Sequence, residues 1–176
     1  MSSDRPPRER KPLPAYQRAL GLLVRREHSA KELRRKLGGR GVGLPELDEA
    51  LETLQRQGFQ DDRRYADAMI RSRALGGHGP TRVRADLRAN GVPSAIVDEA
   101  LNACEVDWAE IAYRVAARSA SRVLRRPGNE RADQQKLVAL LLRRGFSHES
   151  ARAALGAIGA SIETSDVDGE CGESSE

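Results

Sequence analysis

Two stretches of the chain decide its fold, SAKELRRKLGGRGVGLPELDEALETL (29–54) and GPTRVRADLRANGVPSAIVDEALNAC (79–104). They align without gaps at an offset of 50 residues, and both contain the tetrapeptide DEAL. A third stretch, DQQKLVALLLRRGFSHESARAALGAI (133–158), aligns with the second at a further offset of 54 residues. Because one pattern occurs three times, the sequence predicts an array of structural repeats.

The aligned columns contain the residue types that two helices joined by a tight turn require. Residues able to fill a helix N-cap stand at the start, and glycine stands where a left-handed C-cap is needed. Apolar residues recur at helical spacing between these caps. In chain order, the N-cap column is Ser29, Gly79 and Asp133, the C-cap column is Gly41, Gly91 and Gly145, and the core columns are Leu33/Val83/Leu137, Leu37/Leu87/Leu141, Val42/Val92/Phe146, Leu47/Val97/Ala151, Ala50/Ala100/Ala154, Leu51/Leu101/Leu155 and Leu54/Cys104/Ile158. Chance self-similarity of a helical protein does not explain why caps, glycines and core columns agree together.

One more helix precedes each pair, so the predicted unit is a three-helix repeat. A unit of about 50 residues buries too little surface to be comfortably stable alone, and stacking on a neighbour supplies the missing burial. We therefore expect an all-α fold of three tandem three-helix repeats stacked into an elongated, curved array. The predicted helices are 15–26, 30–38, 45–57, 62–75, 80–90, 94–104, 107–126, 134–144 and 148–158. The predicted organisation is a flexible basic arm (1–14), repeats at 15–58, 59–105 and 106–158, and a disordered acidic tail (159–176).

The charge of the chain is divided unevenly along its length. Residues 157–176 contain six acids and no Lys or Arg, while the whole chain has a net charge of +4, so residues 1–156 carry +10. A basic body predicts a polyanionic partner or an acidic protein surface. No apolar run approaches the length that spans a bilayer, and the N-terminus lacks the apolar stretch of a secretory signal, which favours a cytoplasmic location.

Motifs for catalysis, metal binding or cofactor binding are missing from the sequence. Cys104 and Cys171 are not part of a CxxC motif, and Cys104 occupies a core column of the repeat. The stretch GGRGVG (38–43) is interpreted as a helix exit, because no strand precedes it to form a phosphate-binding loop. We expect a protein that is not an enzyme and that binds no cofactor or metal.

Several polar residues near helix starts are interpreted as structural. Asp61 and Asp62 are paired carboxylates, but acids at a helix start commonly cap free N–H groups. Ser29 with Glu32 matches a capping box. The three histidines, His28, His78 and His148, lie beside helix starts and are expected in exposed turns.

Basic residues cluster on particular helices of each repeat. The candidate residues for contact with a partner or with DNA are Arg34, Arg35, Lys36, Arg82, Arg84, Arg88, Arg114, Arg118, Arg122 and Arg125. The last four recur at helical spacing, and no acid lies between Glu110 and Glu130, so they predict a basic stripe along one helix. The alternative is an ordinary solvated face. Arginine favours the contact interpretation because its guanidinium binds carboxylates and phosphates bidentately.

Four stretches resemble the RecX family of recombination regulators. They are RREHSAKELRRKLGGRGV (25–42), LQRQGFQDDRRYADAMIRSR (54–73), GHGPTRVRADLRANGVP (77–93) and LVALLLRRGFS (137–147). The similarity extends over nearly all of 15–158 and is most specific in DDRRYA and GPTRVRADLRANGV. The N-terminal arm and the acidic tail lie outside it.

The resemblance implies three tandem three-helix repeats and a regulator of the RecA recombinase. Such a protein is expected to bind the RecA–DNA filament in its helical groove and to inhibit ATP hydrolysis and strand exchange. Direct DNA contact through the basic surface is a further expectation, and we expect a monomer when the protein is free. The alternative is a DNA-binding protein that uses its three-helix units as helix-turn-helix-like modules. The acidic tail either folds back on the basic body or only solvates the chain.

Overall fold

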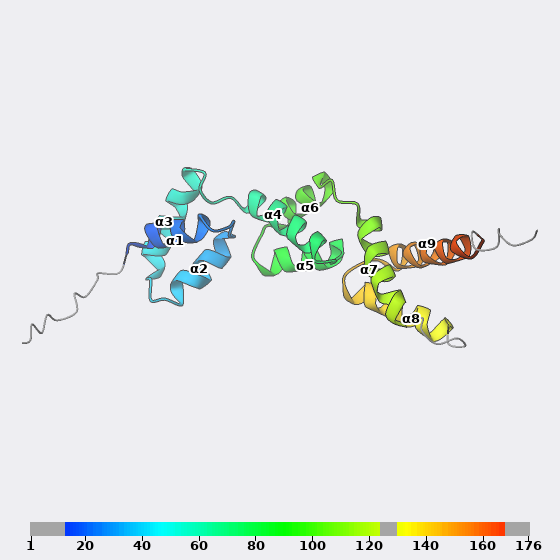
Figure 1. Cartoon of the computed structure of the whole chain (residues 1–176). Helices are drawn as coiled ribbons and strands as arrows, with labels where there is room; N and C mark the ends of the chain where they lie inside the picture. The colour runs from blue at the N-terminus through cyan, green and yellow to red at the C-terminus, as the bar shows by residue number, and fades with distance from the viewer. Residues whose placement is uncertain (1–12, 124–129, 168–176) are drawn as a thin grey trace, which may run out of the picture. The chain divides into compact units, whose positions relative to one another are not determined.

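The computed structural model describes the backbone of residues 13–123 and 130–167, and the side chains of 13–120 and 131–159. Within these ranges the protein consists of nine helices and has no strand (Figure 1). The helices are α1 (Ala15–Leu23), α2 (Ala30–Gly38), α3 (Leu44–Arg56), α4 (Asp62–Leu75), α5 (Pro80–Ala89), α6 (Ser94–Ala103), α7 (Trp108–Val123), α8 (Glu130–Arg143) and α9 (His148–Val167). The predicted all-α class is confirmed. No helix in the described ranges is long and apolar enough to cross a membrane.

The glycine column of the repeat ends α2, α5 and α8 in the same way. Gly41, Gly91 and Gly145 have φ values of 78°, 80° and 90°, which a residue with a Cβ rarely adopts. The residue after each glycine donates a backbone hydrogen bond to the carbonyl five residues earlier, as in a Schellman motif. These bonds join Val42 N to Leu37 O (3.3 Å), Val92 N to Leu87 O (3.2 Å) and Phe146 N to Leu141 O (3.1 Å). The predicted C-cap column is confirmed in all three copies.

The apolar columns form the cores of the repeats. Leu33, Val83 and Leu137 are at most 1% exposed, and the next column, Leu37, Leu87 and Leu141, is fully buried. The last columns are looser, because Leu101, Leu155 and Cys104 are only half-buried. Fully burying a leucine or valine contributes about 1.5–3 kcal/mol, so the residues of the first two columns contribute strongly to the stability of each helix pair.

The chain divides into two compact units, Met1–Tyr65 and Ala66–Glu176. In the first unit, α1, α2 and α3 pack on one another around a shared core (Figure 1). In the second unit, α5 packs on α6, and α7, α8 and α9 pack on one another. Within this unit the turn between α4 and α5 joins the turn between α8 and α9, since Gly79 N donates to Arg144 O (2.8 Å) and Thr81 N to Gly145 O (3.1 Å). The elongated, curved arrangement and the repeat boundaries stay predictions.

In α1, α8 and α9, one helix end lies at least three residues from its predicted position. α1 ends at Leu23, three residues before its predicted end. Asp133 is not an N-cap, because α8 begins at Glu130 and Asp133 lies inside its first turn, where it accepts a hydrogen bond from Lys136 Nζ (2.8 Å). Glu, Arg and Ala are good helix formers, so residues 130–132 add a turn before the expected start.

The last helix is longer than expected. α9 continues to Val167, whereas we predicted its end at 158 and a disordered tail from 159. Gly159 is not a stop, because a single glycine inside a helix costs only about 1 kcal/mol and no proline follows it. Residues 168–176 and the predicted arm up to residue 12 lie outside the described residues.

Candidate partner-binding surface

Two of the predicted contact residues form the same ion pair in successive repeats. Arg34 Nε on α2 lies 2.9 Å from Asp48 Oδ1 on α3. The equivalent residues in the next repeat are Arg84 on α5 and Asp98 on α6, which also form an ion pair. All four side chains are at least 36% exposed, and an ion pair of this kind contributes at most about 1 kcal/mol. Each arginine therefore joins the last two helices of its repeat only weakly. A carboxylate of a partner protein could replace Asp48 or Asp98 in the pair.

The other candidate contact residues on α2 and α5 differ in whether they already pair with an acid. Lys36 Nζ lies 3.4 Å from Glu32, and Arg82 Nε lies 3.1 Å from Asp86, each four residues away on the same helix. Arg35 and Arg88 are exposed, and neither side chain pairs with an acid in the part of the chain that the structure describes. Arg35 and Arg88 are thus the cations on these helices most available to a partner.

Arg114 and Arg118, the first two members of the predicted basic stripe, lie on α7. Arg114 and Arg118 are exposed, one turn apart, on the side of α7 opposite the buried Ala112 and Ala116. Arg114 Nε lies 3.4 Å from Glu110 Oε1, an exposed pair that contributes little to stability. Arg122 and Arg125 lie outside the residues whose side chains are described.

A small cavity of about 220 Å³ adjoins this stripe. Three arginines, no described acid, and the glycine turn after α4 surround it. The lining is Ala74, Leu75, Gly76, Gly77, Ile111, Arg114, Val115, Arg118, Ser119 and Arg144. Because the lining is basic and partly apolar, the cavity suits an anionic group with an apolar neighbour.

Arg144 completes this cavity, although it is not among the predicted contact residues. Its Nη1 donates to the carbonyl oxygens of Gly76 (3.2 Å) and Gly77 (3.3 Å), which hold the guanidinium over the glycine turn. These contacts join residues almost 70 positions apart. The repeat alignment could not reveal them, because spacing within one repeat says nothing about which turn of another repeat lies opposite.

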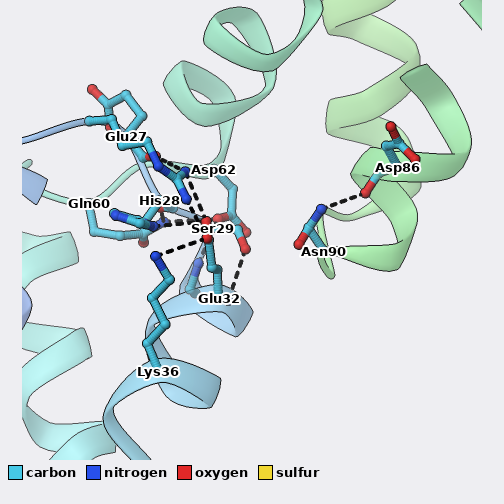
Figure 2. A network of polar contacts seen from close by, with 11 residues as sticks. Glu27, His28, Ser29, Glu32, Lys36, Gln60, Asp62, Asp86 and Asn90 are labelled. Carbon is cyan, nitrogen blue, oxygen red and sulfur yellow. Dashed lines mark hydrogen bonds and ion pairs between the residues drawn. The ribbon is translucent and has the colours of Figure 1, made fainter. Parts of the chain in front are cut away.

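A buried polar network surrounds the start of α2 and corrects one expectation. His28, expected in an exposed turn, is only 2% exposed, and Glu32 is 6% exposed (Figure 2). The Glu32 carboxylate lies 2.5 Å from Arg26 Nη2, 2.8 Å from His28 Nδ1 and 3.4 Å from Lys36 Nζ. The contact between His28 and Glu32 is an ion pair only when the imidazole is protonated.

The network changes the ionisation of both buried groups. Burial alone would raise the pKa of Glu32, but Arg26 and His28 hold it down at about 2. Burial lowers the pKa of His28 from its ordinary value of 6.5, an effect that Glu32 opposes. At neutral pH the site therefore contains an ionised Glu32 beside a neutral His28, which is an anchor for the helix start and not an acid–base pair.

The two aspartates at the start of α4 cap different helices. Asp61 Oδ1 accepts from Arg63 N (2.6 Å), which confirms its capping role at α4. Asp62 Oδ1 instead accepts from Ala30 N at the start of α2 (3.0 Å) and from Gln60 Nε2 (2.8 Å) (Figure 2). Ser29 Oγ accepts from Glu32 N (3.0 Å), so the N-cap at Ser29 is confirmed. The described residues contain no group of three metal-binding side chains, and these contacts are structural.

Comparison with known proteins identifies the family. Family models described as "RecX, first three-helix domain" and "RecX, second three-helix domain" match residues 15–62 and 61–101. The regulatory protein RecX of Xanthomonas axonopodis pv. citri is 45% identical over 138 residues, which is 78% of this chain and 83% of that one. The regulatory protein RecX of Stenotrophomonas maltophilia (strain K279a) is 43% identical over 150 residues, or 85% and 88% of the two chains.

Solved structures agree with these relatives. A crystal structure of a regulatory protein RecX matches with a TM-score of 0.71 and 28% identity, over 81% of this chain and 71% of that one. The RecX structure from Lactobacillus salivarius has the same fold, with a TM-score of 0.70 and 22% identity over 83% and 95% of the chains. The sequence relatives, the family models and the fold agree, and the chain belongs to the RecX family of regulatory proteins.

Proposed function

We propose that this protein is a negative regulator of homologous recombination and DNA repair. It binds the RecA–DNA filament in its helical groove and inhibits RecA ATPase and strand exchange. The observation that carries the proposal is family membership, because a relative named regulatory protein RecX is 45% identical over 78% of the chain. The protein acts by binding and not by catalysis, as a monomer in the cytoplasm.

The charge distribution supports an anionic binding partner. Residues 1–156 carry +10, and Arg35, Arg88, Arg114 and Arg118 are exposed on three different helices. A filament of DNA and protein presents phosphates and acidic side chains, and opposite charge raises the rate of encounter by about 10–1000-fold at low salt. Arginines on several helices also give the protein several points of attachment.

The arginine-lined cavity beside α7 is proposed as one of these attachment points. Arg144 is already held in place by the carbonyls of Gly76 and Gly77, so little side-chain entropy is lost when it binds an anion. A partner carboxylate between Arg144, Arg114 and Arg118 would gain charge-assisted hydrogen bonds beside the apolar wall at Val115.

Inhibition follows if the protein binds one state of the filament better than the others. A ligand shifts a conformational equilibrium only by its difference in affinity for the two states. Attachment at several points along the groove would therefore stabilise an inactive arrangement of RecA protomers or block the entry of a second duplex. The protein needs no nucleotide site of its own for this effect.

The test is the DNA-dependent ATPase of RecA with this protein titrated in. We expect inhibition at micromolar or lower concentrations, together with cosedimentation of the protein with preformed filaments. Normal ATPase activity, combined with no binding to filaments, would contradict the proposal. Strand exchange measured at the same concentrations separates inhibition of ATP hydrolysis from a block of the second duplex.

A second candidate function is DNA binding through helix-turn-helix-like modules. The tandem three-helix domains and the exposed arginines of α5 and α7 favour it. Affinity for naked duplex DNA, measured against salt, distinguishes the two. Tight binding with a steep salt slope and strong sequence preference would favour this alternative, whereas a RecA regulator should bind naked DNA weakly and without preference.

A further inference from the structure

The third repeat lacks the ion pair that bridges the last two helices of the other repeats. Arg34–Asp48 joins α2 to α3, and Arg84–Asp98 joins α5 to α6. At the offset of 54 residues, the positions equivalent to Arg84 and Asp98 are Val138 on α8 and Arg152 on α9. An apolar residue opposite a cation cannot form this bridge, so α8 and α9 are not clamped across their outer face.

A wide groove of about 690 Å³ lies between α8 and α9 at this place. Its floor is apolar and half-buried, formed by Val138, Ala139, Leu142 and Leu155. Gly156 and Gly159 lie on the α9 side, where a Cβ added to either residue would meet no atom within 4 Å. The missing side chains leave the groove open and allow another backbone to approach closely.

The rim of the groove is basic. Arg131, His148 and Arg152 are exposed, and the amides of Gln134 and Gln135 lie beside them. Neither Arg131 nor Arg152 pairs with an acid among the described residues, and none of the described lining residues is acidic. Two available guanidinium groups beside an apolar floor suit a ligand that is both anionic and apolar.

We propose that this groove binds an acidic amphipathic helix of a protein partner. Apolar side chains at i, i+3, i+4 and i+7 of that helix would cover the floor, as in other helix-in-groove complexes. Its carboxylates would pair with Arg131 and Arg152. DNA matches the rim but not the floor, because a phosphate backbone gains nothing from Val138, Leu142 and Leu155. The proposal goes beyond RecA regulation and does not depend on it.

The probe is a labelled synthetic peptide of about 18 residues, with Leu at helical spacing and Glu at the outer positions. Fluorescence anisotropy measures its binding to the full chain. The double variant Val138→Arg/Arg152→Asp rebuilds the bridge of the other two repeats and closes the groove. Gly156→Leu fills the groove without changing charge. Arg143→Gln is the matched control, because it removes one positive charge from α8, as the double variant does overall, outside the groove.

We expect the natural chain to bind this peptide with a Kd of about 10 µM, and both groove variants to bind at least about tenfold more weakly. Arg143→Gln should stay within about twofold, and a peptide with Lys in place of Glu should not bind. Circular dichroism verifies that each variant is folded, and Gly156→Leu replaces a poor helix former by a good one.

Two results would overturn the proposal. One is that the acidic peptide does not bind, or binds both groove variants as well as the natural chain. The other is that a single-stranded oligonucleotide binds the natural chain but neither groove variant, while both variants still bind the peptide. That result would assign the groove to nucleic acid.

Discussion

Glu32 remains charged although the first repeat buries it almost completely. Arg26, His28 and Lys36 lie around its carboxylate, and Arg26 and His28 hold its pKa at about 2, against 4.5 in an unfolded chain. A group whose pKa is depressed in the folded state stabilises the fold above its unfolded pKa. The network therefore stabilises the fold at neutral pH, and this stabilisation is lost in acid.

We predict that Glu32→Gln lowers the free energy of unfolding by about 3 kcal/mol at pH 7, which is the energy that corresponds to the difference between the two pKa values. The loss should shrink as the pH falls from 4.5 towards 2, because the natural carboxylate becomes protonated in the unfolded chain first. Urea unfolding at pH 7 and at pH 3 measures this difference.

Glu52→Gln on α3 is the control for this measurement, since Glu52 is exposed. It should change stability by less than about 0.5 kcal/mol at either pH. His28 acts in the same direction, because its depressed pKa makes the fold lose stability as the pH falls below 6.5. A Glu32→Gln penalty that is equal at pH 7 and pH 3 would show that the carboxylate acts by packing and not by charge.

Gly79 is a second residue whose role depends on a distant part of the chain. Its φ of −84° suits any residue, but an added Cβ would collide with the backbone of Gly145 and Phe146. The collision is with main-chain atoms, which cannot rotate away. The N-cap column of the repeat therefore has glycine here because of close approach and not because of backbone conformation.

Gly79→Ala should accordingly lower stability by about 2–3 kcal/mol, as overpacking does elsewhere. Gly21→Ala in α1 is the matched control, because a Cβ there meets nothing within 4 Å. Removing a glycine from the interior of a helix should stabilise the protein by about 0.5–1 kcal/mol. Thermal unfolding of the two variants measures these opposite changes in stability. Similar shifts of the melting temperature in both variants would contradict the close approach of Gly79 to the backbone of Gly145.

At the scale of helices, the repeat pattern predicted turns and cores better than helix ends. The glycines of the C-cap column and the leucines of the core columns are local features, and spacing within one repeat reveals them. Asp62 capping α2 and Arg144 holding the glycine turn are contacts between elements far apart in sequence. α9 extends beyond 158 because no proline follows to stop it, and the polar composition there misled the prediction of a tail.

The repeated ion pairs provide a test at the same scale that separates stability from binding. Arg34→Ala and Arg84→Ala should each cost less than about 1 kcal/mol of stability, because both pairs are exposed. If a partner uses these arginines, the double variant Arg34→Ala/Arg84→Ala should bind filaments at least about tenfold more weakly. Its free energy of unfolding should stay close to that of the natural chain. Asp48→Ala/Asp98→Ala breaks the same pairs and keeps the arginines, so its binding should not weaken.

For the whole molecule, the sequence predicted the helical class and the positive net charge of the body, but not which cationic side chains a partner can use. Charge counting treats every arginine alike. The structure separates Arg35 and Arg88, which are available, from Arg34 and Arg84, which are paired. It also adds Arg144 to Arg114 and Arg118 around one cavity. These distinctions depend on neighbouring helices, so they become visible only in three dimensions.

The last prediction concerns filament binding by the complete protein. Arg114→Gln/Arg118→Gln removes two of the three arginines around the cavity, and we expect at least about tenfold weaker filament binding at 0.1 M salt. Arg25→Gln/Arg71→Gln removes the same charge from two other exposed positions and should change affinity by less than about threefold. Because salt screens exposed charges, the difference between the two variants should narrow at higher ionic strength. Equal losses in both would mean that net charge alone drives binding, and that the cavity beside α7 has no special role.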